Sequence, residues 1–215
     1  SRLTGIDQDY HLFRTRAFVD ASYLDYGRIY FEAIDAQYEG ASLPPLRIDQ
    51  SRSDILNAFF DWRLLEVNGQ PWYVRGGRQE LGFGSQRLVS PLDWANTRRT
   101  FDGVRMFSRK KDTDLDLFWT QPVIPDPSSL DQVDGNQHFA GAWYSKRPNE
   151  TDVRDLYLLY LGNSAPAAQL GAPVPGFDVW TMGARQAGNL GAFRYDHEAM
   201  FQLGDRGTAD ILAGA

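Results

Sequence analysis

The sequence predicts an all-β protein from its composition and from the spacing of its apolar residues. Of its 215 residues, 13% are aromatic and 20 are glycine, and this composition favours strands and turns over helices. Short runs alternate apolar with polar side chains, which is the two-residue period of a strand with one buried face. No apolar run approaches the roughly 18 residues of a membrane helix, so a helical membrane protein is excluded.

About ten such runs follow one another, each roughly 7–12 residues long. The clearest covers residues 114–123, where Leu115, Leu117 and Trp119 share one face and polar side chains share the other. The ten predicted strands are residues 11–21, 28–38, 55–67, 72–83, 99–109, 114–123, 139–145, 153–161, 178–187 and 192–203. Proline is confined to the stretches between these runs and to strand edges, because it cannot donate a hydrogen bond within a sheet.

Three of the connecting stretches are long and rich in proline. They cover residues 42–52, 122–136 and 162–176, and the last has room for a short helix at residues 164–170. Loops of this length are uncommon in compact soluble domains but ordinary on the outer side of a membrane barrel.

Alternation alone leaves two architectures open, a membrane-spanning β-barrel and a soluble β-sandwich, because both have one polar and one apolar face on each strand. Aromatic residues near the predicted strand ends favour the barrel, since barrels carry aromatic girdles where they meet the two membrane surfaces. The candidate girdle residues are Tyr10, Trp72, Tyr73, Trp119, Trp143, Tyr144 and Trp180.

Charge and motif content argue against several functions. The net charge of −6 and the isoelectric point of about 5.0 argue against nucleic acid as a partner. With no cysteine there is no thiolate metal site. Asp112, Asp114 and Asp116 resemble the start of a calcium loop, but Leu117 stands where the required glycine belongs. No phosphate-binding loop or nucleophile elbow is present either, so we expect no enzyme, no metal and no cofactor.

Residues 77–105 form the most distinctive stretch of the chain. It contains Gly-Arg-Gln at residues 77–79, a glycine-broken loop, Asp-Trp-Ala-Asn at residues 93–96 and Arg-Thr-Phe-Asp-Gly at residues 99–103. This stretch resembles the alginate-export family of outer-membrane barrels, and the similarity runs through it without insertions or deletions. Weaker similarities lie at residues 181–185 and 195–204.

The resemblance implies an antiparallel up-and-down transmembrane β-barrel of roughly eighteen strands in the cell outer membrane. We therefore expect residues 1–215 to be a single alginate-export-like domain that forms an incomplete part of this barrel. The implied function is a channel that passes an anionic polysaccharide or another solute, with membrane lipid as a further partner. A soluble carbohydrate-binding β-sandwich is the alternative, and the sequence identifies no periplasmic partner.

The resemblance also implies a lumen lined with arginine, whose planar fork binds carboxylates in pairs. Arg78, Arg99 and Arg105 match the family motif position by position. Further candidates, which rest on alternation alone, are Arg14, Arg16, Arg63 and Arg185. The competing interpretation of each is an ion pair with a neighbouring carboxylate that holds the wall, and the net charge of −6 is at odds with a strongly positive lumen. The motif residues expected to lock turns and loops are Asp93, Trp94, Asn96 and Asp102.

Overall fold

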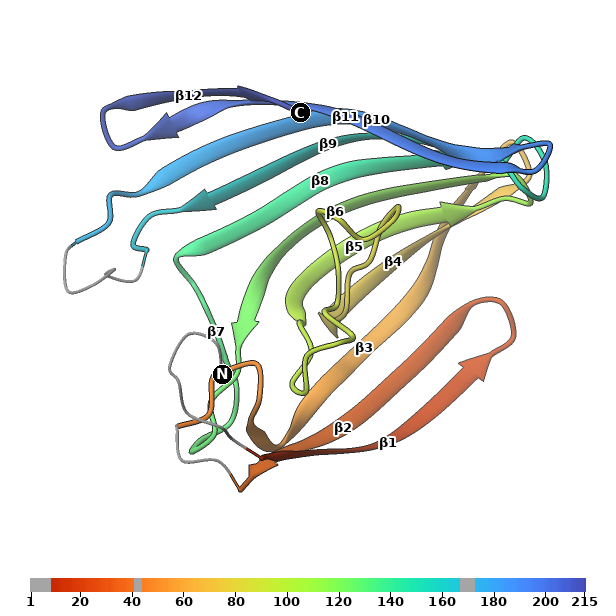
Figure 1. Ribbon diagram of the computed structural model, residues 1–215. Helices are drawn as coiled ribbons and strands as arrows, with labels where there is room; N and C mark the ends of the chain where they lie inside the picture. The colour runs from red at the N-terminus through yellow and green to blue at the C-terminus, as the bar shows by residue number, and fades with distance from the viewer. Residues whose placement is uncertain (1–8, 41–43, 167–172) are drawn as a thin grey trace.

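The computed structural model describes residues 9–40, 44–166 and 173–215, and these residues contain strands and connections only (Figure 1). No helix in these ranges is long and apolar enough to cross a membrane. The strands are β1 (His11–Tyr23), β2 (Gly27–Glu39), β3 (Ser51–Val67), β4 (Gln70–Gln79), β5 (Phe101–Arg109), β6 (Thr113–Ile124), β7 (Gln132–Val133), β8 (Gln137–Lys146), β9 (Val153–Asn163), β10 (Phe177–Leu190), β11 (Phe193–Arg206) and β12 (Ala209–Gly214).

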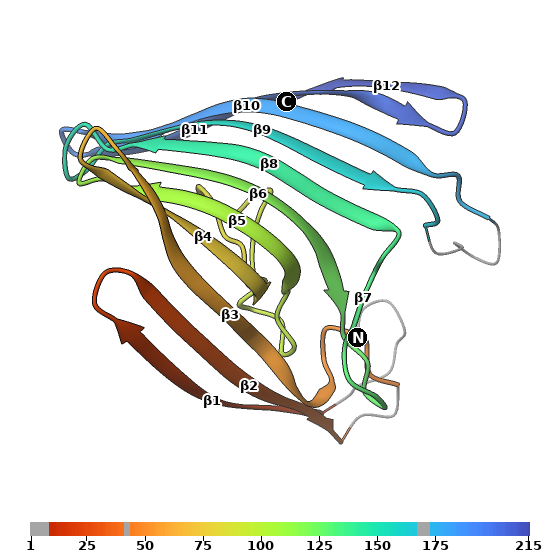
Figure 2. The ribbon, with the colours of Figure 1, turned by 180° about the vertical axis from the view of Figure 1, so that it is seen from behind.

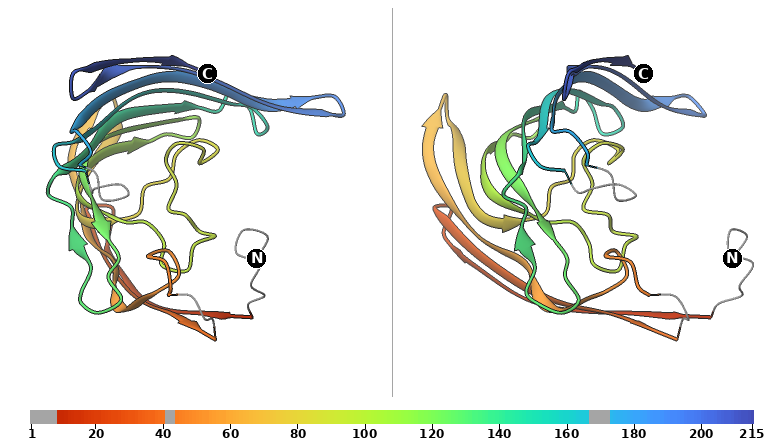
Figure 3. Two further views of the ribbon diagram at one scale, coloured as in Figure 1. Left: turned by 60° about the vertical axis from the view of Figure 1, so that its left-hand side comes forward. Right: turned by 90° about the vertical axis from the view of Figure 1, so that its left-hand side faces the viewer.

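All twelve strands belong to one antiparallel sheet whose order follows the chain from β1 to β12, except that β7 pairs only with β6. This is the up-and-down topology that the sequence predicts. The sheet is a single curved layer, as the views from behind and from the side show (Figures 2 and 3). A β-sandwich needs two packed sheets, so the structure favours the arc of a barrel wall, with β1 and β12 as its edges.

The ten predicted strands correspond to β1–β6 and β8–β11, and the sequence analysis missed β7 and β12. The first is a two-residue pairing, and the second is a short run in which small residues hide the alternation. The predicted strand at residues 72–83 ends early, at Gln79, because the chain leaves the sheet there. Of the predicted helix at residues 164–170, residues 167–170 lie outside the described residues, and residues 164–166 are not helical.

The two faces of the sheet differ in the way the alternation predicts. On β6, Asp114, Asp116 and Thr120 point to the concave face, and Leu117 and Trp119 to the convex face. The convex face carries exposed apolar side chains on neighbouring strands: Ile29, Phe31, Phe60, Trp62, Val104, Leu117, Trp119, Leu156, Leu158, Trp180, Met182, Phe201 and Leu203.

The two ends of the sheet differ in the length of their connections. Tight turns join β1 to β2, β3 to β4, β5 to β6, β8 to β9 and β10 to β11, all at one end. At the other end, which we call the loop end, the connections that follow β2, β4, β6 and β9 are longer, and a tight turn at residues 207–208 joins β11 to β12. Outer-membrane barrels have short turns on the periplasmic side and longer loops outside.

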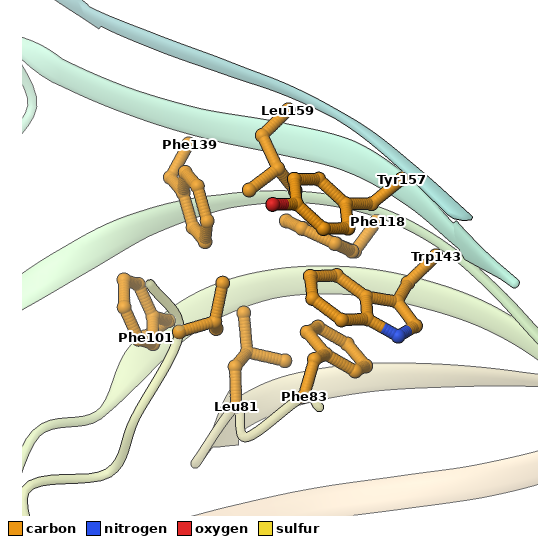
Figure 4. Packing of buried hydrophobic residues seen from close by; sticks show 9 residues of the cluster. Leu81, Phe83, Phe101, Phe118, Phe139, Trp143, Tyr157 and Leu159 are labelled. Atoms are coloured by element: carbon orange, nitrogen blue, oxygen red, sulfur yellow. The ribbon is translucent and has the colours of Figure 1, made fainter. Parts of the chain in front are cut away.

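The hydrophobic core lies on the concave face, where the chain between β4 and β5 folds inward. Leu81, Phe83 and Val89 of this connection pack against a cluster of wall side chains (Figure 4): Phe101, Phe118, Phe139, Trp143, Tyr157 and Leu159. The girdle prediction is therefore wrong for Trp143, which is only 2% exposed and stacks on Tyr157 with 4.4 Å between ring centroids. It is also wrong for Tyr73, whose ring faces Phe107 on the concave side.

Candidate functional site on the concave face

Residues 80–100, which we call the inner segment, cross the concave face between the two halves of the sheet (Figure 3). Near one end of the segment, the amide of Asn96 donates hydrogen bonds to the carbonyls of Phe13, Gln37 and Asp49 at 2.9–3.1 Å. On the other side, Arg87 reaches β11 and pairs with Glu198 at 2.8 Å. The segment is therefore fastened both to β1 and β2 and to β11.

The backbone of the inner segment has an unusual conformation that its packing holds in place. Gln86, Leu92 and Arg98 adopt positive φ angles, which are uncommon for residues other than glycine. Gly84 has φ +57°, and a Cβ there would lie 2.8 Å from the indole of Trp143. Such conformations persist where surrounding contacts determine them, so the segment is a fixed part of the concave face.

Ion pairs run across the concave face from strand to strand. They are Arg16–Glu32 at 2.6 Å, Arg28–Asp20 at 2.8 Å, Arg75–Asp61 at 2.6 Å, Arg105–Asp116 at 2.6 Å and Arg185–Asp155 at 2.8 Å. In four of the five the carboxylate is buried and the guanidinium is the more exposed partner. Each of these four arginines is thus held in one orientation by a buried carboxylate, and Arg16, with 34% of its side chain exposed, is the most open of them to the concave side.

Aromatic rings accompany these ion pairs, and the sequence analysis missed their role. Phe18 stacks on Tyr30 with 5.9 Å between centroids, and Tyr30 stacks on Phe59 at 5.2 Å. The guanidinium of Arg75 lies 3.6 Å from the centroid of Phe59. The available signal was strand parity, since Tyr30 lies two residues from both Arg28 and Glu32 and therefore shares their face.

Six of the seven predicted arginines have carboxylate partners. Arg16, Arg105 and Arg185 belong to the ion pairs above, and Arg63 pairs with Asp25 and Glu66 at the tight-turn end. Arg14 lies 3.9 Å from Asp93 and donates to the carbonyl of Ala95 at 2.9 Å, which ties β1 to the inner segment. Arg99 is exposed, and no ion pair joins it to any described carboxylate.

Arg78 lies apart from the other arginines, in a cluster at the loop end. It pairs with Asp102 at 2.9 Å, lies 3.6 Å from Asp54 and donates to the carbonyl of Asp131 at 3.3 Å. Burial and the nearby charge of Asp54 raise the pKa of Asp131 to about 6, although hydrogen bonds from Ser51 and from a backbone amide oppose the shift. The cluster holds the connection between β6 and β8 against β3 and β4.

The four motif residues have different surroundings. Asn96 is 7% exposed and joins three segments, as described above. Asp102 holds Arg78. Asp93 is mostly exposed and pairs with Arg98 within the inner segment. Trp94 is 73% exposed, so nothing in its burial indicates a locking role.

A metal site can be assessed only within the described ranges, where no group of three or more His, Asp or Glu side chains is arranged to hold an ion. The arrangement is instead one of charge-paired forks and ring faces along a curved wall. Such a surface offers many weak contacts to a polar chain that moves along it.

The sequence model of the alginate export family matches residues 2–215, which is nearly the whole chain. No curated protein gives a significant match. The matched range includes β4, the inner segment and β5 and extends well beyond them on both sides.

Proposed function

Because the chain belongs to the alginate export family, whose members are outer-membrane polysaccharide export porins, we propose that its concave face lines a channel for an acidic polysaccharide. The observation that carries this proposal is the separation of side chains between the two faces. In the strand interiors the ion-paired side chains lie on the concave face and the large exposed side chains of the convex face are apolar, whereas convex-face charges such as Arg154 and Asp178 lie near strand ends. A sheet with this pattern suits a wall with lipid outside and water inside.

The twelve-stranded sheet would then be one arc of a larger barrel in the outer membrane. A strand edge in lipid leaves backbone groups without hydrogen bonds, at a cost of several kcal/mol for each group, so a membrane-spanning sheet has to close. In this sheet β1 and β12 are edges. Closure would require further strands beside them, which agrees with the larger barrel that the family implies.

The ion pairs on the wall support an acidic solute that is bound weakly. A conduit must bind its solute at many weak sites, because tight binding would stop the flow. A carboxylate of the polymer would compete with Glu32 for Arg16, whose side chain is 34% exposed, and would gain little net free energy in each exchange. Arg99 would bind more strongly, since no wall carboxylate competes for it.

The tight-turn end of the wall would face the periplasm and the loop end the exterior, by the usual arrangement of outer-membrane barrels. The inner segment leaves the sheet at the loop end and narrows the concave side there. An exported chain would therefore meet the wall first at the tight-turn end.

Planar-bilayer conductance of the full-length protein tests this function. We expect discrete openings that a soluble polyuronate blocks, and block weakened about three- to tenfold in Arg16→Gln and Arg99→Gln, since each loses a charged hydrogen-bond donor. The matched control is Arg154→Gln, an exposed arginine on the opposite face of β9 from Asp155. Openings that the polyuronate does not block would refute the proposal that the solute is acidic. Folded protein that forms no openings would refute the proposal that the protein is a channel.

A further inference from the structure

A cavity of about 200 Å³ lies on the concave face at the tight-turn end, between the turn that joins β1 to β2 and the strands that follow. Its lining combines two aromatic rings, Tyr73 and Phe107, with an arginine and a carboxylate, Arg28 and Asp61. The two rings are stacked with 5.5 Å between centroids. Arg28 lies 3.9 Å from Asp61, so donor and acceptor groups adjoin the rings.

Ring faces continue from this cavity along the wall toward β1. Tyr30 and Phe59 stack beside Arg28, whose guanidinium lies 5.2 Å from the centroid of Tyr30. Phe18 completes the row on β1 and is 65% exposed, although it points to the concave face. The part of the Phe18 ring that does not face Tyr30 is exposed on the polar face of the wall, where a passing solute can contact it.

Pyranose rings match this surface in chemistry. A pyranose has an apolar C–H face, which packs on an aromatic ring, and an edge of hydroxyl groups that both donate and accept hydrogen bonds. The row offers ring faces from Phe18 and Tyr73. At their edge, Arg28, which is held by Asp20, offers a donor, and Asp61, which is held by Arg75, offers an acceptor. An inorganic anion would use the arginine but not the rings, and a lipid chain would use the rings but not the ion pair.

We propose that this row is a sugar-binding subsite, formed by Phe18, Tyr30, Tyr73 and Phe107, that stacks pyranose rings of the exported polysaccharide. The inference rests on the proposed channel function and adds to it a recognition element that acts on the sugar ring rather than on its charge. Because the cavity lies at the tight-turn end, the subsite receives the polymer where it first meets the wall. Sugar oligomers without carboxylates therefore bind there too.

The test measures block of the full-length channel by two oligomers of equal length, a neutral glucan and a polyuronate. In Phe18→Leu and Tyr73→Leu we expect the half-blocking concentration of both oligomers to rise about three- to tenfold, the range expected when one ring contact is lost. The matched control is Phe13→Leu, on the same strand as Phe18 but on its other face, which leaves both values unchanged.

The outcomes separate this subsite from the channel function. Polyuronate block without any glucan block in the parent protein overturns the subsite and leaves the channel standing. Block by both oligomers that is unchanged in Phe18→Leu and Tyr73→Leu also overturns the subsite alone. If neither oligomer blocks the channel, the subsite and the acidic solute are both overturned.

Discussion

Among single residues, Asp131 gives the protein a pH-dependent contact. Its carboxyl has a pKa of about 6 when the connection between β6 and β8 is docked, because it is buried and lies near the charge of Asp54. In an undocked chain the pKa is about 4. The docked state therefore favours the neutral carboxyl, so docking is most stable below about pH 4, weakens as the pH rises to about 6, and is constant above that.

Hydrogen exchange of the amides in residues 125–136 measures this effect after correction for intrinsic exchange rates. We expect protection in the unsubstituted protein to fall about fiftyfold between pH 4 and pH 7, because the docked and undocked pKa values of about 6 and about 4 differ by about two units. In Asp131→Asn the side chain stays neutral, and we expect protection that does not change with pH. An equal decline in the variant would show that another group controls the docking.

For the arginines, the sequence predicts the face of the sheet on which each side chain lies, but not its partner. Arg16, Arg105 and Arg185 lie on the polar face that alternation predicts, because strand parity fixes the face of each side chain. Their partners were not predictable in detail, because the neighbour across a strand pair depends on register, and bulges such as the one between Glu32 and Ala33 shift the register.

Among the elements, the inner segment depends on a few side chains that join it to the sheet. The side-chain amide of Asn96 donates to three carbonyls from three different segments. Its two N–H groups share these three acceptors, and their loss at a nearly buried site costs about 2–3 kcal/mol. The neighbouring Trp94 is exposed, so its side chain contributes little.

Limited proteolysis of the folded protein in detergent tests this difference. We expect Asn96→Ala to be cleaved within residues 80–100 at least tenfold faster than the unsubstituted protein, because the segment opens more often. Trp94→Ala, two residues away, is the matched control and should be cleaved at the unsubstituted rate. Equal rates for the two variants would mean that the other contacts of the segment, among them the packing of Leu81 and Phe83 and the ion pair of Arg87, hold it without the Asn96 amide.

The inner segment was also where sequence-based prediction was least complete. The motif at residues 77–105 identifies the family, but its glycines and polar residues give no period from which a path can be deduced. Its position on the concave face depends on Leu81 and Phe83 packing against rings from β5, β6, β8 and β9, which are distant in sequence. For the same reason Trp143 was assigned to a membrane girdle when it is covered by the segment.

In the whole molecule, the proposed channel requires that the concave face meets water and the convex face meets lipid. Strand alternation predicts the separation of the two faces, and the structure shows it on one continuous sheet. Alternation does not reveal which solvent each face meets, because a soluble sheet and a barrel wall share the pattern. The assignment rests on the family and on the exposed apolar side chains of the convex face.

The most direct test is the accessibility of single introduced cysteines in the folded, membrane-inserted protein. Residues 1–215 contain no cysteine of their own that would also be labelled. Met182→Cys and Ala187→Cys place thiols on the convex and concave faces of β10. We predict that a membrane-impermeant maleimide labels Ala187→Cys and spares Met182→Cys. A nitroxide-bearing lipid is expected to quench a fluorophore attached at position 182 but not one attached at position 187. Rapid aqueous labelling at position 182 with no lipid quenching would contradict the claim that this sheet is a membrane wall.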